Sequence, residues 1–281
     1  MDATTRTAKG VRVLQYLALA AYVVFLGFPL FWLFSTAFKP PTELSVLEPT
    51  LLPKDWTTAN FAEALRATQL PRALLNSLIV AVATAVITTL IAMPAAYALA
   101  RSRSKIRTAA VGWILISQLF PFILLVIPLF IMLKNFALID TLLGLVLVYV
   151  TWALPFTLWM LQGYVSAIPA DLEEAAATDG AGRLTILWQI VFPLLMPGVV
   201  ATAMFAFISA WNEFFFALVI IQNPSLETAP LLLARYVGAE GQVNLGPLSA
   251  TALLTTLPSL LIFAIAQRRL VSGLMAGSVK G

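Results

Sequence analysis

The amino-acid sequence predicts an all-α integral membrane protein with six transmembrane helices. Hydrophobic residues make up 60% of the chain and charged residues only 11%, whereas a soluble domain carries about 25% charged residues. Six runs of about 20 mostly apolar residues are each long enough to cross roughly 30 Å of hydrocarbon as a helix. Basic residues gather in alternate connections between these runs, as they do in the loops of a multi-span protein.

The predicted spans cover residues 13–38, 77–100, 109–133, 142–164, 194–221 and 251–267. We expect them to form a single transmembrane domain over residues 1–281. The first run follows a basic segment, as the apolar part of a signal peptide would. It is too long for that role, and no small-residue cleavage site follows it, so we interpret it as an uncleaved anchor.

Lysine and arginine residues indicate which side of the membrane each connection faces, because cytoplasmic loops carry an excess of both. With the N-terminus inside, the inner side receives Arg6, Lys9, Arg12, Arg101, Arg103, Lys105, Arg107, Arg183, Arg268, Arg269 and Lys280. The outer side receives Lys39, Lys54, Arg66, Arg72, Lys134 and Arg235. Both termini, including a C-terminal tail at 268–281, are therefore predicted to be cytoplasmic in a multi-pass cell-membrane protein.

The connection at 165–193, called the elbow below, is unusually polar for this chain. Its charged residues are Asp171, Glu173, Glu174, Asp179 and Arg183. Each would cost about 2.5 to 3.5 kcal/mol at the centre of a membrane helix. The elbow is therefore not a seventh span, and we expect it to stay in water on the cytoplasmic side.

The local sequence of the elbow predicts a helix, a turn and a second short helix. Pro169 suits a first helical turn, and the acidic residues after it favour the positive N-terminal end of a helix. Gly180 and Gly182 end that helix and allow a positive φ. Helices that lie on anionic lipid usually carry basic polar faces. The acidic face therefore favours docking in a groove of a cytoplasmic protein over lying on the membrane surface.

The residue types exclude several kinds of chemistry. The chain has no cysteine and no histidine, which argues against zinc or copper sites and against a nucleophile paired with a histidine. No G-x-x-x-x-G-K-[ST] motif is present, so the chain has no phosphate-binding loop. We expect no cofactor in this chain, no enzyme activity of its own, and no binding of nucleic acid despite a formal charge of +4.

The fifth predicted span contains the polar sequence Trp211, Asn212 and Glu213. A carboxylate within a span is costly unless it faces protein or water. One interpretation is structural, with hydrogen bonds from Asn212 and Glu213 to a neighbouring helix. The other is functional, with all three residues lining a translocation pathway, because an aromatic ring beside polar groups suits a sugar.

The elbow resembles the EAA signature of ABC importer permeases. The matching residues are Glu174, Ala175, Ala176, Gly180, Ile190, Phe192 and Pro193. Phe192 stands where the family usually has leucine, an exchange of one apolar residue for another. The stretches "FKPPTEL", "AAYALARSRS", "AWNEFFFALV" and "QRRLVSGLMAGSVKG" resemble the maltose-type carbohydrate uptake branch, and its MalG-like subunit in particular.

This resemblance implies the ABC importer permease fold, with the elbow as a coupling helix-turn-helix. It implies as partners a second homologous permease, two cytoplasmic ABC ATPases that bind ATP and Mg, an extracytoplasmic solute-binding protein, and membrane lipid. The residues implied in coupling to the ATPase are Glu173, Glu174, Ala175, Ala176, Asp179, Gly180 and Arg183. In the long loop before the last span, Arg235 and Tyr236 are candidates for contact with the binding protein.

The function implied is that of a membrane-spanning permease that couples ATPase closure to alternating access and imports a sugar or oligosaccharide. A glycerophosphodiester or another polar solute is an alternative substrate. A self-sufficient secondary transporter is a further alternative, but such carriers usually place coupling charges near the midplane and contain inverted repeats. Here Glu213 is the one acidic residue within a predicted span, and the six spans show no evident halves.

Overall fold

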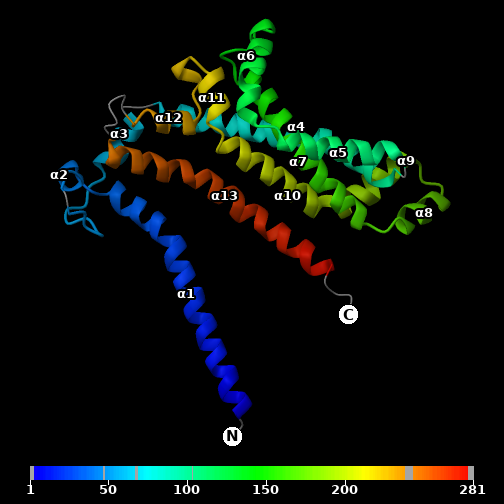
Figure 1. Ribbon diagram of the computed structural model, residues 1–281, viewed down its shortest axis with the longest axis horizontal. Helices are drawn as coiled ribbons and strands as arrows, with labels where there is room; N and C mark the ends of the chain where they lie inside the picture. Colours follow the sequence, from blue (N-terminus) through cyan, green and yellow to red (C-terminus); the bar gives the residue numbers. More distant parts are fainter. Residues whose placement is uncertain (1–2, 47, 67–68, 103, 238–242, 278–281) are drawn as a thin grey trace. The chain divides into compact units, whose positions relative to one another are not determined.

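The computed structural model describes residues 3–46, 48–66, 69–102, 104–237 and 243–277, and the regular elements in these ranges are helices (Figure 1). The helices are α1 (Ala3–Ala37), α2 (Pro41–Leu44), α3 (Ala59–Arg66), α4 (Leu70–Arg101), α5 (Lys105–Leu119), η1 (Phe122–Leu125), α6 (Val126–Asn135), α7 (Leu142–Ala167), α8 (Asp171–Thr178), α9 (Arg183–Thr185), η2 (Ile186–Val191), α10 (Phe192–Trp211), α11 (Phe215–Ile220), η3 (Pro224–Leu226), α12 (Ala229–Ala234) and α13 (Leu245–Gly277).

The chain divides into two compact units. The first comprises Met1–Leu70 and Leu233–Thr256, and the second comprises Pro71–Leu232 and Leu257–Gly281. The second unit contains the elbow and the Trp211–Glu213 sequence, and the first contains Arg235 and Tyr236. The two groups of candidate residues are therefore described separately.

Within the described residues, five helices are long and apolar enough to cross a membrane. They cover Val11–Ala37, Leu70–Arg101, Leu142–Ala167, Arg183–Trp211 and Leu245–Gln267. A sixth candidate is a pair of helices, Arg107–Leu119 and Ile123–Asn135, bent by 91° at the break between them. The predicted all-helical membrane architecture is confirmed, with five continuous spans and one broken pair.

The third predicted span, 109–133, is broken at Pro121. Phe120 ends α5 in an extended conformation, with φ −74° and ψ 126°. A proline disfavours the helical conformation for the residue before it, because its ring collides with that residue's backbone. Proline thus favours the break at this point, although α4 and α7 continue through Pro94 and Pro155.

The fifth predicted span, 194–221, differs from the structure at both ends. The elbow's second helix is not separate, because α9, the π-helix η2 and α10 form one continuous helical segment from Arg183 to Trp211. At the other end, α10 stops at Trp211 and α11 begins only at Phe215. The predicted span is thus one long helix that starts in the elbow, followed by a short separate helix.

The last helix extends beyond the predicted span, since α13 continues to Gly277 through most of the predicted tail. Residues 278–281, including Lys280, lie outside the described residues. The same holds for Arg103 and for the side chains of Arg6, Lys9, Arg268 and Arg269, which contributed to the predicted orientation.

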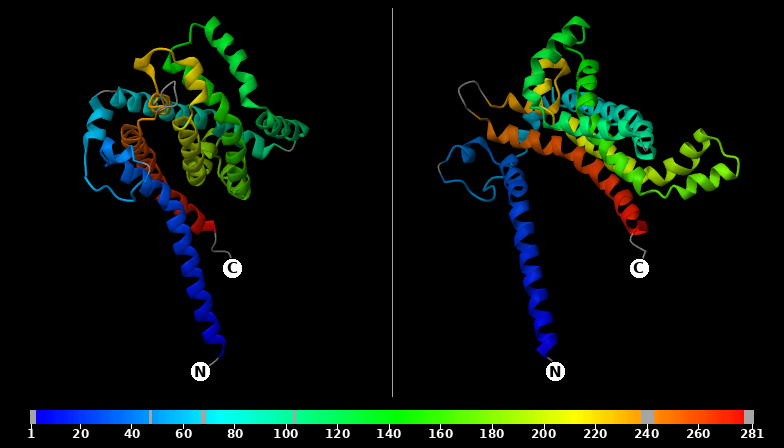
Figure 2. Two further views of the ribbon diagram at one scale, coloured as in Figure 1. Left: turned by 60° about the vertical axis from the view of Figure 1, so that its left-hand side comes forward. Right: turned by 45° about the vertical axis from the view of Figure 1, so that its right-hand side comes forward.

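In the second unit, α4, α7 and α10 pack around two apolar clusters. One cluster includes Val80, Tyr149 and Phe207, and the other includes Met93 and Leu161. The helices α7 and α10 lie side by side (Figures 1 and 2). Their approach is close, because a Cβ atom added to Gly198 of α10 would lie 2.5 Å from Cγ of Tyr164 in α7. Small residues at such contacts allow membrane helices to pack tightly.

In the first unit, the segment between α1 and α3 folds back onto the end of α1. The ring of Phe38 lies 4.8 Å from that of Phe34, 5.7 Å from that of Trp56 and 4.9 Å from that of Phe61, between centroids. The side-chain amide of Asn60 donates to the carbonyls of Ala37 at 2.9 Å and Lys39 at 2.8 Å. This connection is thus an ordered structure with its own hydrogen bonds.

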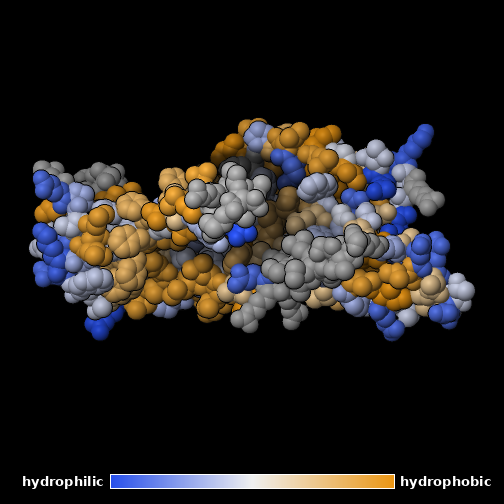
Figure 3. All heavy atoms as spheres, turned by 90° about the horizontal axis from the view of Figure 1, so that it is seen from below, coloured by the Kyte–Doolittle hydropathy of each residue, from blue (hydrophilic) through white to orange (hydrophobic). Residues whose placement is uncertain are grey.

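Large apolar side chains are exposed along the spanning helices. Leu90 in α4 is 61% exposed and Ile265 in α13 is 70% exposed. Apolar side chains also make up much of the surface drawn in Figure 3. A membrane helix can expose such residues because the hydrocarbon of the bilayer is itself apolar.

Candidate functional site

The elbow projects beyond the ends of α7 and α10 (Figure 2, right), and α8 contacts both α4 and η2. Helix α8 begins at Asp171, and its first turn holds Asp171, Glu173 and Glu174. Pro169 precedes the helix, and its carbonyl accepts the N–H of Leu172 at 3.4 Å. The acidic first turn matches the favourable placement of negative charge at a helix N-terminus.

The turn after α8 depends on one of the two predicted glycines. Gly180 has φ +88°, a conformation that side chains with a Cβ rarely adopt. Gly182 instead has φ −72° and ψ 159° and precedes α9 in an ordinary extended conformation. The expectation that both glycines allow a positive φ was therefore right for Gly180 and wrong for Gly182.

Glu174, which begins the EAA signature, and Glu173, which precedes it, have different surroundings. Glu174 is exposed, whereas the carboxylate of Glu173 faces inward and forms an ion pair with Arg101, with 2.5 Å between Oε1 and Nη2. The Nε–H of Arg101 also donates to Oε1 of Glu173 at 2.7 Å, and the hydroxyl of Tyr97 donates to Oε2 at 2.7 Å. The structure thus places Glu173 in an internal contact with α4.

The outer surface of the elbow combines charged and apolar side chains. Among the predicted coupling residues, Glu174, Ala175, Asp179, Gly180 and Arg183 are exposed and Ala176 is half-buried. Large apolar side chains lie in the same segment: Leu172 is 46% exposed, Leu184 is 74% exposed and Trp188 is 51% exposed. A surface that mixes acidic groups with protruding apolar side chains is suited to binding another protein.

The elbow is linked directly to the membrane-spanning part of the chain. Helix α8 packs against η2, and η2 continues without interruption into α10. A π-helical turn is rare and often marks a functional position. A displacement of the elbow would therefore act on α10 through a continuous helix.

Trp211, Asn212 and Glu213 lie at the break between α10 and α11, and their side chains have different environments. Trp211 is buried and stacks on Phe207, with 5.6 Å between ring centroids. Asn212 is exposed, and its amide donates to the carbonyl of Ile208 at 2.9 Å. Trp211 is thus a packing residue in this structure, while the side chain of Asn212 lies at the surface.

Glu213 bonds to its own chain through both carboxylate oxygens. Oε1 accepts the N–H of Phe216 at 2.9 Å, and Oε2 accepts the N–H of Ala217 at 3.2 Å. Oε2 also accepts the hydroxyl of Tyr149 in α7 at 2.5 Å. The carboxylate thus satisfies N–H groups at the start of α11 that have no intrahelical partner. Its bond with Tyr149 reaches a neighbouring helix, as the structural interpretation expects, whereas Asn212 bonds only within α10.

Sequence reasoning did not identify Tyr97, Arg101 or Tyr149 as partners of the candidate acids. Arg101 contributed to the predicted orientation, and it lies with Tyr97 in the stretch "AAYALARSRS" that resembles the family, but no contact was assigned to either residue. Each contact joins residues far apart in the chain, separated by 72 positions for Arg101 and Glu173 and by 64 positions for Tyr149 and Glu213. The sequence contained one signal for these contacts, namely that each is made by polar residues within an apolar span or near its end. Such residues are costly in a membrane unless another group pairs with them.

Arg235 and Tyr236 follow α12 in the first unit. Arg235 is exposed and Tyr236 is half-buried. The hydroxyl of Tyr236 accepts a hydrogen bond from Oγ1 of Thr251 at 2.9 Å, and its carbonyl accepts the N–H of Asn244 at 3.3 Å. Tyr236 therefore joins the end of α12 to the start of α13, while Arg235 lies at the surface.

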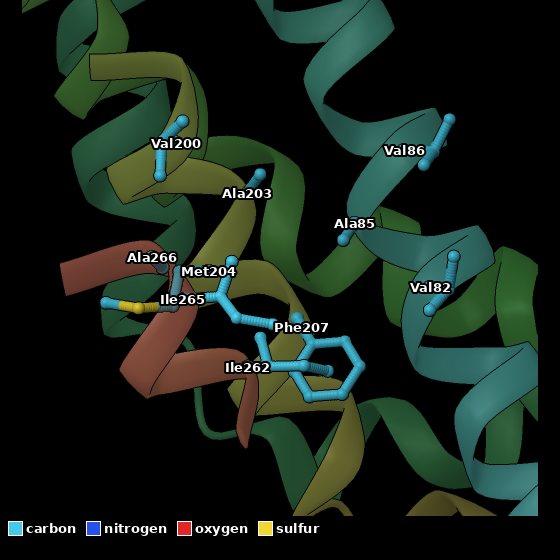
Figure 4. A pocket seen from close by; sticks show the side chains of 10 residues that line it. All are labelled: Val82, Ala85, Val86, Val200, Ala203, Met204, Phe207, Ile262, Ile265 and Ala266. Atoms are coloured by element: carbon cyan, nitrogen blue, oxygen red, sulfur yellow. The ribbon is translucent and has the colours of Figure 1, made fainter. Parts of the chain in front are cut away.

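A groove in the second unit lies between α4, α10 and α13 (Figure 4). Its volume is about 390 Å³, and it is lined by Val82, Ala85, Val86, Val200, Ala203, Met204, Phe207, Ile262, Ile265 and Ala266. No side chain in this set offers a hydrogen bond. Because a sugar needs polar partners for its hydroxyls, this groove suits an apolar occupant and does not by itself form a sugar site.

The family of binding-protein-dependent transport system inner membrane components matches this chain over residues 88–275. The chain belongs to this family. The matched region begins in α4 and ends in α13, so it includes the elbow and both polar contacts described above. The family resemblance stated from the sequence is therefore confirmed.

Relatives and a solved structure agree with this membership. The permease is 56% identical over 229 residues to ABC transporter permease protein ORF1 of Streptomyces antibioticus, covering 82% of this chain and 100% of the relative. It is 38% identical over 263 residues to the diacetylchitobiose uptake system permease protein DasC of Streptomyces coelicolor, covering 93% and 95%. A chain from a bacterial ABC transporter involved in the import of the acidic polysaccharide alginate has the same fold, with a TM-score of 0.78, 21% identity, and coverage of 94% and 97%.

The protein is thus a multi-pass inner-membrane permease subunit of a binding-protein-dependent ABC importer, and its relatives include permeases of sugar uptake systems. It is the transport subunit and not the ATPase. The predicted fold class and the predicted function are both confirmed at this level.

Proposed function

We propose that the elbow is the surface through which a cytoplasmic ATPase moves this permease. The observation that supports the proposal is the division of roles within α8. Glu173 holds the helix to α4, while Glu174 and the neighbouring residues point away from the chain and remain uncovered. An exposed acidic and apolar surface on an anchored helix matches a knob that docks in a groove of a partner protein.

In this proposal Glu174, Asp179 and Arg183 supply charged contacts, and Ala175, Ala176 and Gly180 allow the ATPase to approach the backbone closely. Closure of the ATPases on ATP and Mg displaces the elbow, and η2 carries the displacement into α10. The spans then change their packing so that the pathway opens alternately to each side. The complete transporter contains this permease, a second homologous permease, two ATPases and an extracytoplasmic solute-binding protein.

The orientation that the basic residues predict agrees with this assembly. It places both termini and the elbow in the cytoplasm, where ATP is available. It places the first unit's loops, including Arg235 and Tyr236, on the outer side. We assign Arg235 to contact with the solute-binding protein and Tyr236 to holding the loop in shape.

We propose a sugar or oligosaccharide as the imported solute. The name of DasC connects that relative with diacetylchitobiose, and the transporter of known structure imports a polysaccharide. Asn212 supplies an exposed amide beside the break in the fifth span, while Trp211 and Glu213 hold that break in place. A glycerophosphodiester is the alternative solute, because its hydroxyl groups pose similar demands.

Charge reversal tests the assignment of the elbow. In Glu174→Lys, the exposed carboxylate becomes an ammonium group that opposes the basic groups expected in the ATPase cleft, and like charges at an interface cost several kcal/mol. The ATPase should be lost during co-purification while the permease keeps its melting temperature. The control is Glu48→Lys, the same change at an exposed residue of the first unit. Retention of the ATPase by Glu174→Lys as tight as in the unaltered protein would show that the elbow is not the docking surface.

A binding assay identifies the solute. We expect a solute-binding protein to be encoded beside this permease, and that protein is titrated in a calorimeter with trehalose, maltose, diacetylchitobiose and glycerophosphocholine. Tight binding of one saccharide supports the sugar assignment. Binding of glycerophosphocholine alone would replace it with the alternative, and the assignment of the elbow would stand unchanged.

A further inference from the structure

We infer that Arg101 and Tyr97 form a clasp that joins the elbow to α4, so that movement of the elbow is transmitted to α4 as well as to α10. The inference rests on the proposed function of the elbow. It assigns a positioning role to two residues, and neither of them is part of the exposed docking surface.

The clasp consists of three side chains and one backbone carbonyl. The guanidinium of Arg101 bonds to Glu173 through both Nε and Nη2, and Nη2 also donates to the carbonyl of Ile168 at 3.0 Å. The hydroxyl of Tyr97 bonds to the other oxygen of the same carboxylate at 2.7 Å. Arg101 therefore holds the elbow at two points, one before α8 and one in its first turn.

The surroundings make this contact stronger than a surface ion pair. The side chain of Arg101 is 23% exposed and that of Glu173 is 13% exposed, so water screens the pair only partly. Exposed pairs often contribute little to stability, whereas removing one partner of a largely buried pair leaves the other charge without compensation. Arginine also suits the role better than lysine, because its planar group donates several hydrogen bonds in fixed directions.

The position of the clasp gives it a mechanical consequence. Arg101 is the last residue of α4, and Tyr97 lies one turn earlier on the same helix. The elbow is joined to α10 through continuous backbone, but it is joined to α4 through side chains. Without the clasp, α8 can swing with α10 while α4 stays behind. With the clasp, the ends of both helices must follow the elbow.

Cysteine labelling can follow α4 directly, because the chain contains no cysteine. Single cysteines are placed at Arg72, Leu75 and Ala98, which are exposed near the two ends of α4, where water can reach a thiol. The assembled transporter, in nanodiscs, is treated with fluorescein maleimide with and without ATP and Mg²⁺. We expect ATP to change the labelling rate at one or more of these positions. In Arg101→Gln we expect this change to shrink roughly 2- to 30-fold, the range by which residues along a coupling route alter the coupling between two sites.

The clasp itself is measured by a spin-label pair at Ala98 in α4 and Ala177 in α8, both of which are exposed. The distance distribution should be narrow in the parent protein and broad in Arg101→Gln. The exchanged pair R101E/E173R should restore a narrow distribution and most of the ATP-dependent labelling. Arg107→Gln is the matched control, because Arg107 forms no ion pair among the described residues. It should behave as the parent protein does.

Several outcomes would overturn the inference. One is a labelling rate that does not depend on ATP at any of the three α4 positions of the parent protein. The others are an ATP-dependent change in labelling rate that is unchanged in Arg101→Gln, and a failure of the exchanged pair to restore that change. Release of the ATPase by Arg101→Gln would also overturn it, because Arg101 would then act in docking. Failure of the proposed function is distinguishable, since it appears as retention of the ATPase by Glu174→Lys.

Discussion

Tyr149 and Glu213 join two helices of the permease through a hydrogen bond of 2.5 Å between the tyrosine hydroxyl and carboxylate Oε2. The same carboxylate accepts two N–H groups at the start of α11. Glu213 therefore stabilises the break between α10 and α11 and ties that break to α7. A charged residue in an apolar span is explained here by partners within the chain.

Substitution of Glu213 tests this arrangement. In Glu213→Ala, the Tyr149 hydroxyl and two backbone N–H groups lose their acceptor, and we expect a loss of about 1 to 3 kcal/mol in the free energy of unfolding. Glu213→Gln retains one carbonyl oxygen and should lose less. Unfolding by SDS in mixed micelles measures both variants. An alanine variant as stable as the parent would contradict the capping role.

The contact between α7 and α10 predicts different outcomes for two glycines. At Gly198 an added Cβ would lie 2.5 Å from Cγ of Tyr164, whereas at Gly163 in α7 it would meet no atom within 4 Å. Gly198→Ala should therefore destabilise the protein by about 1 to 3 kcal/mol, the usual effect of overpacking. Gly163→Ala should be neutral or slightly stabilising, because alanine is the better helix former. Melting temperatures in detergent would decide the point, and equal effects of the two changes would refute it.

The turn of the elbow predicts a second contrast between glycines. Gly180→Ala forces a residue with a Cβ into the left-handed region at φ +88°, which costs about 1 to 2 kcal/mol. Gly182 has a negative φ and open space around its Cα, so Gly182→Ala should be tolerated. Limited proteolysis of the elbow should be faster for Gly180→Ala alone. Equal cleavage of both variants would indicate that the turn does not depend on Gly180.

The first unit contains a carboxylate whose ionisation depends on the fold. The Thr50 hydroxyl, which donates to Glu43 at 2.5 Å, holds the pKa of Glu43 below its ordinary value of 4.5. Desolvation opposes this effect, and the backbone N–H groups of Lys54 and Asp55 support it. Because the pKa is lower in the folded state, ionisation of Glu43 stabilises the loop above pH 4.5. That stabilisation is lost as the pH falls through the folded-state pKa.

Hydrogen exchange at the Lys54 amide, which donates to both oxygens of Glu43 at 3.1 Å, should report this titration. After correction for the intrinsic exchange rate, we expect protection to decline as the pH falls below 4.5. In Thr50→Val the largest cause of the lowered pKa is removed, so the decline should begin at a higher pH. The same midpoint in both proteins would show that Thr50 does not control the ionisation of Glu43.

Much of the architecture could be predicted because it depends on local composition. A run of about 20 apolar residues favours a membrane helix wherever its neighbours lie. The charges of the elbow exclude it from hydrocarbon for the same reason. The break at Pro121 agrees with the restriction on the residue before a proline, but that rule could not locate it, because α4, α7 and α13 continue through Pro94, Pro155 and Pro258. The continuity of α9, η2 and α10 had no such signal, because a helix can end or continue after a polar turn.

The sequence by itself determined the membrane class, which parts of the chain are apolar enough to span, the place of the elbow and the family. Each of these depends on properties of short segments that survive in any arrangement of the helices. Only the tertiary structure decided that Glu173 faces Arg101 while Glu174 is exposed, and that Glu213 bonds to Tyr149. The physical reason is that a polar side chain in an apolar protein must find a partner. Which partner it finds depends on how distant helices pack.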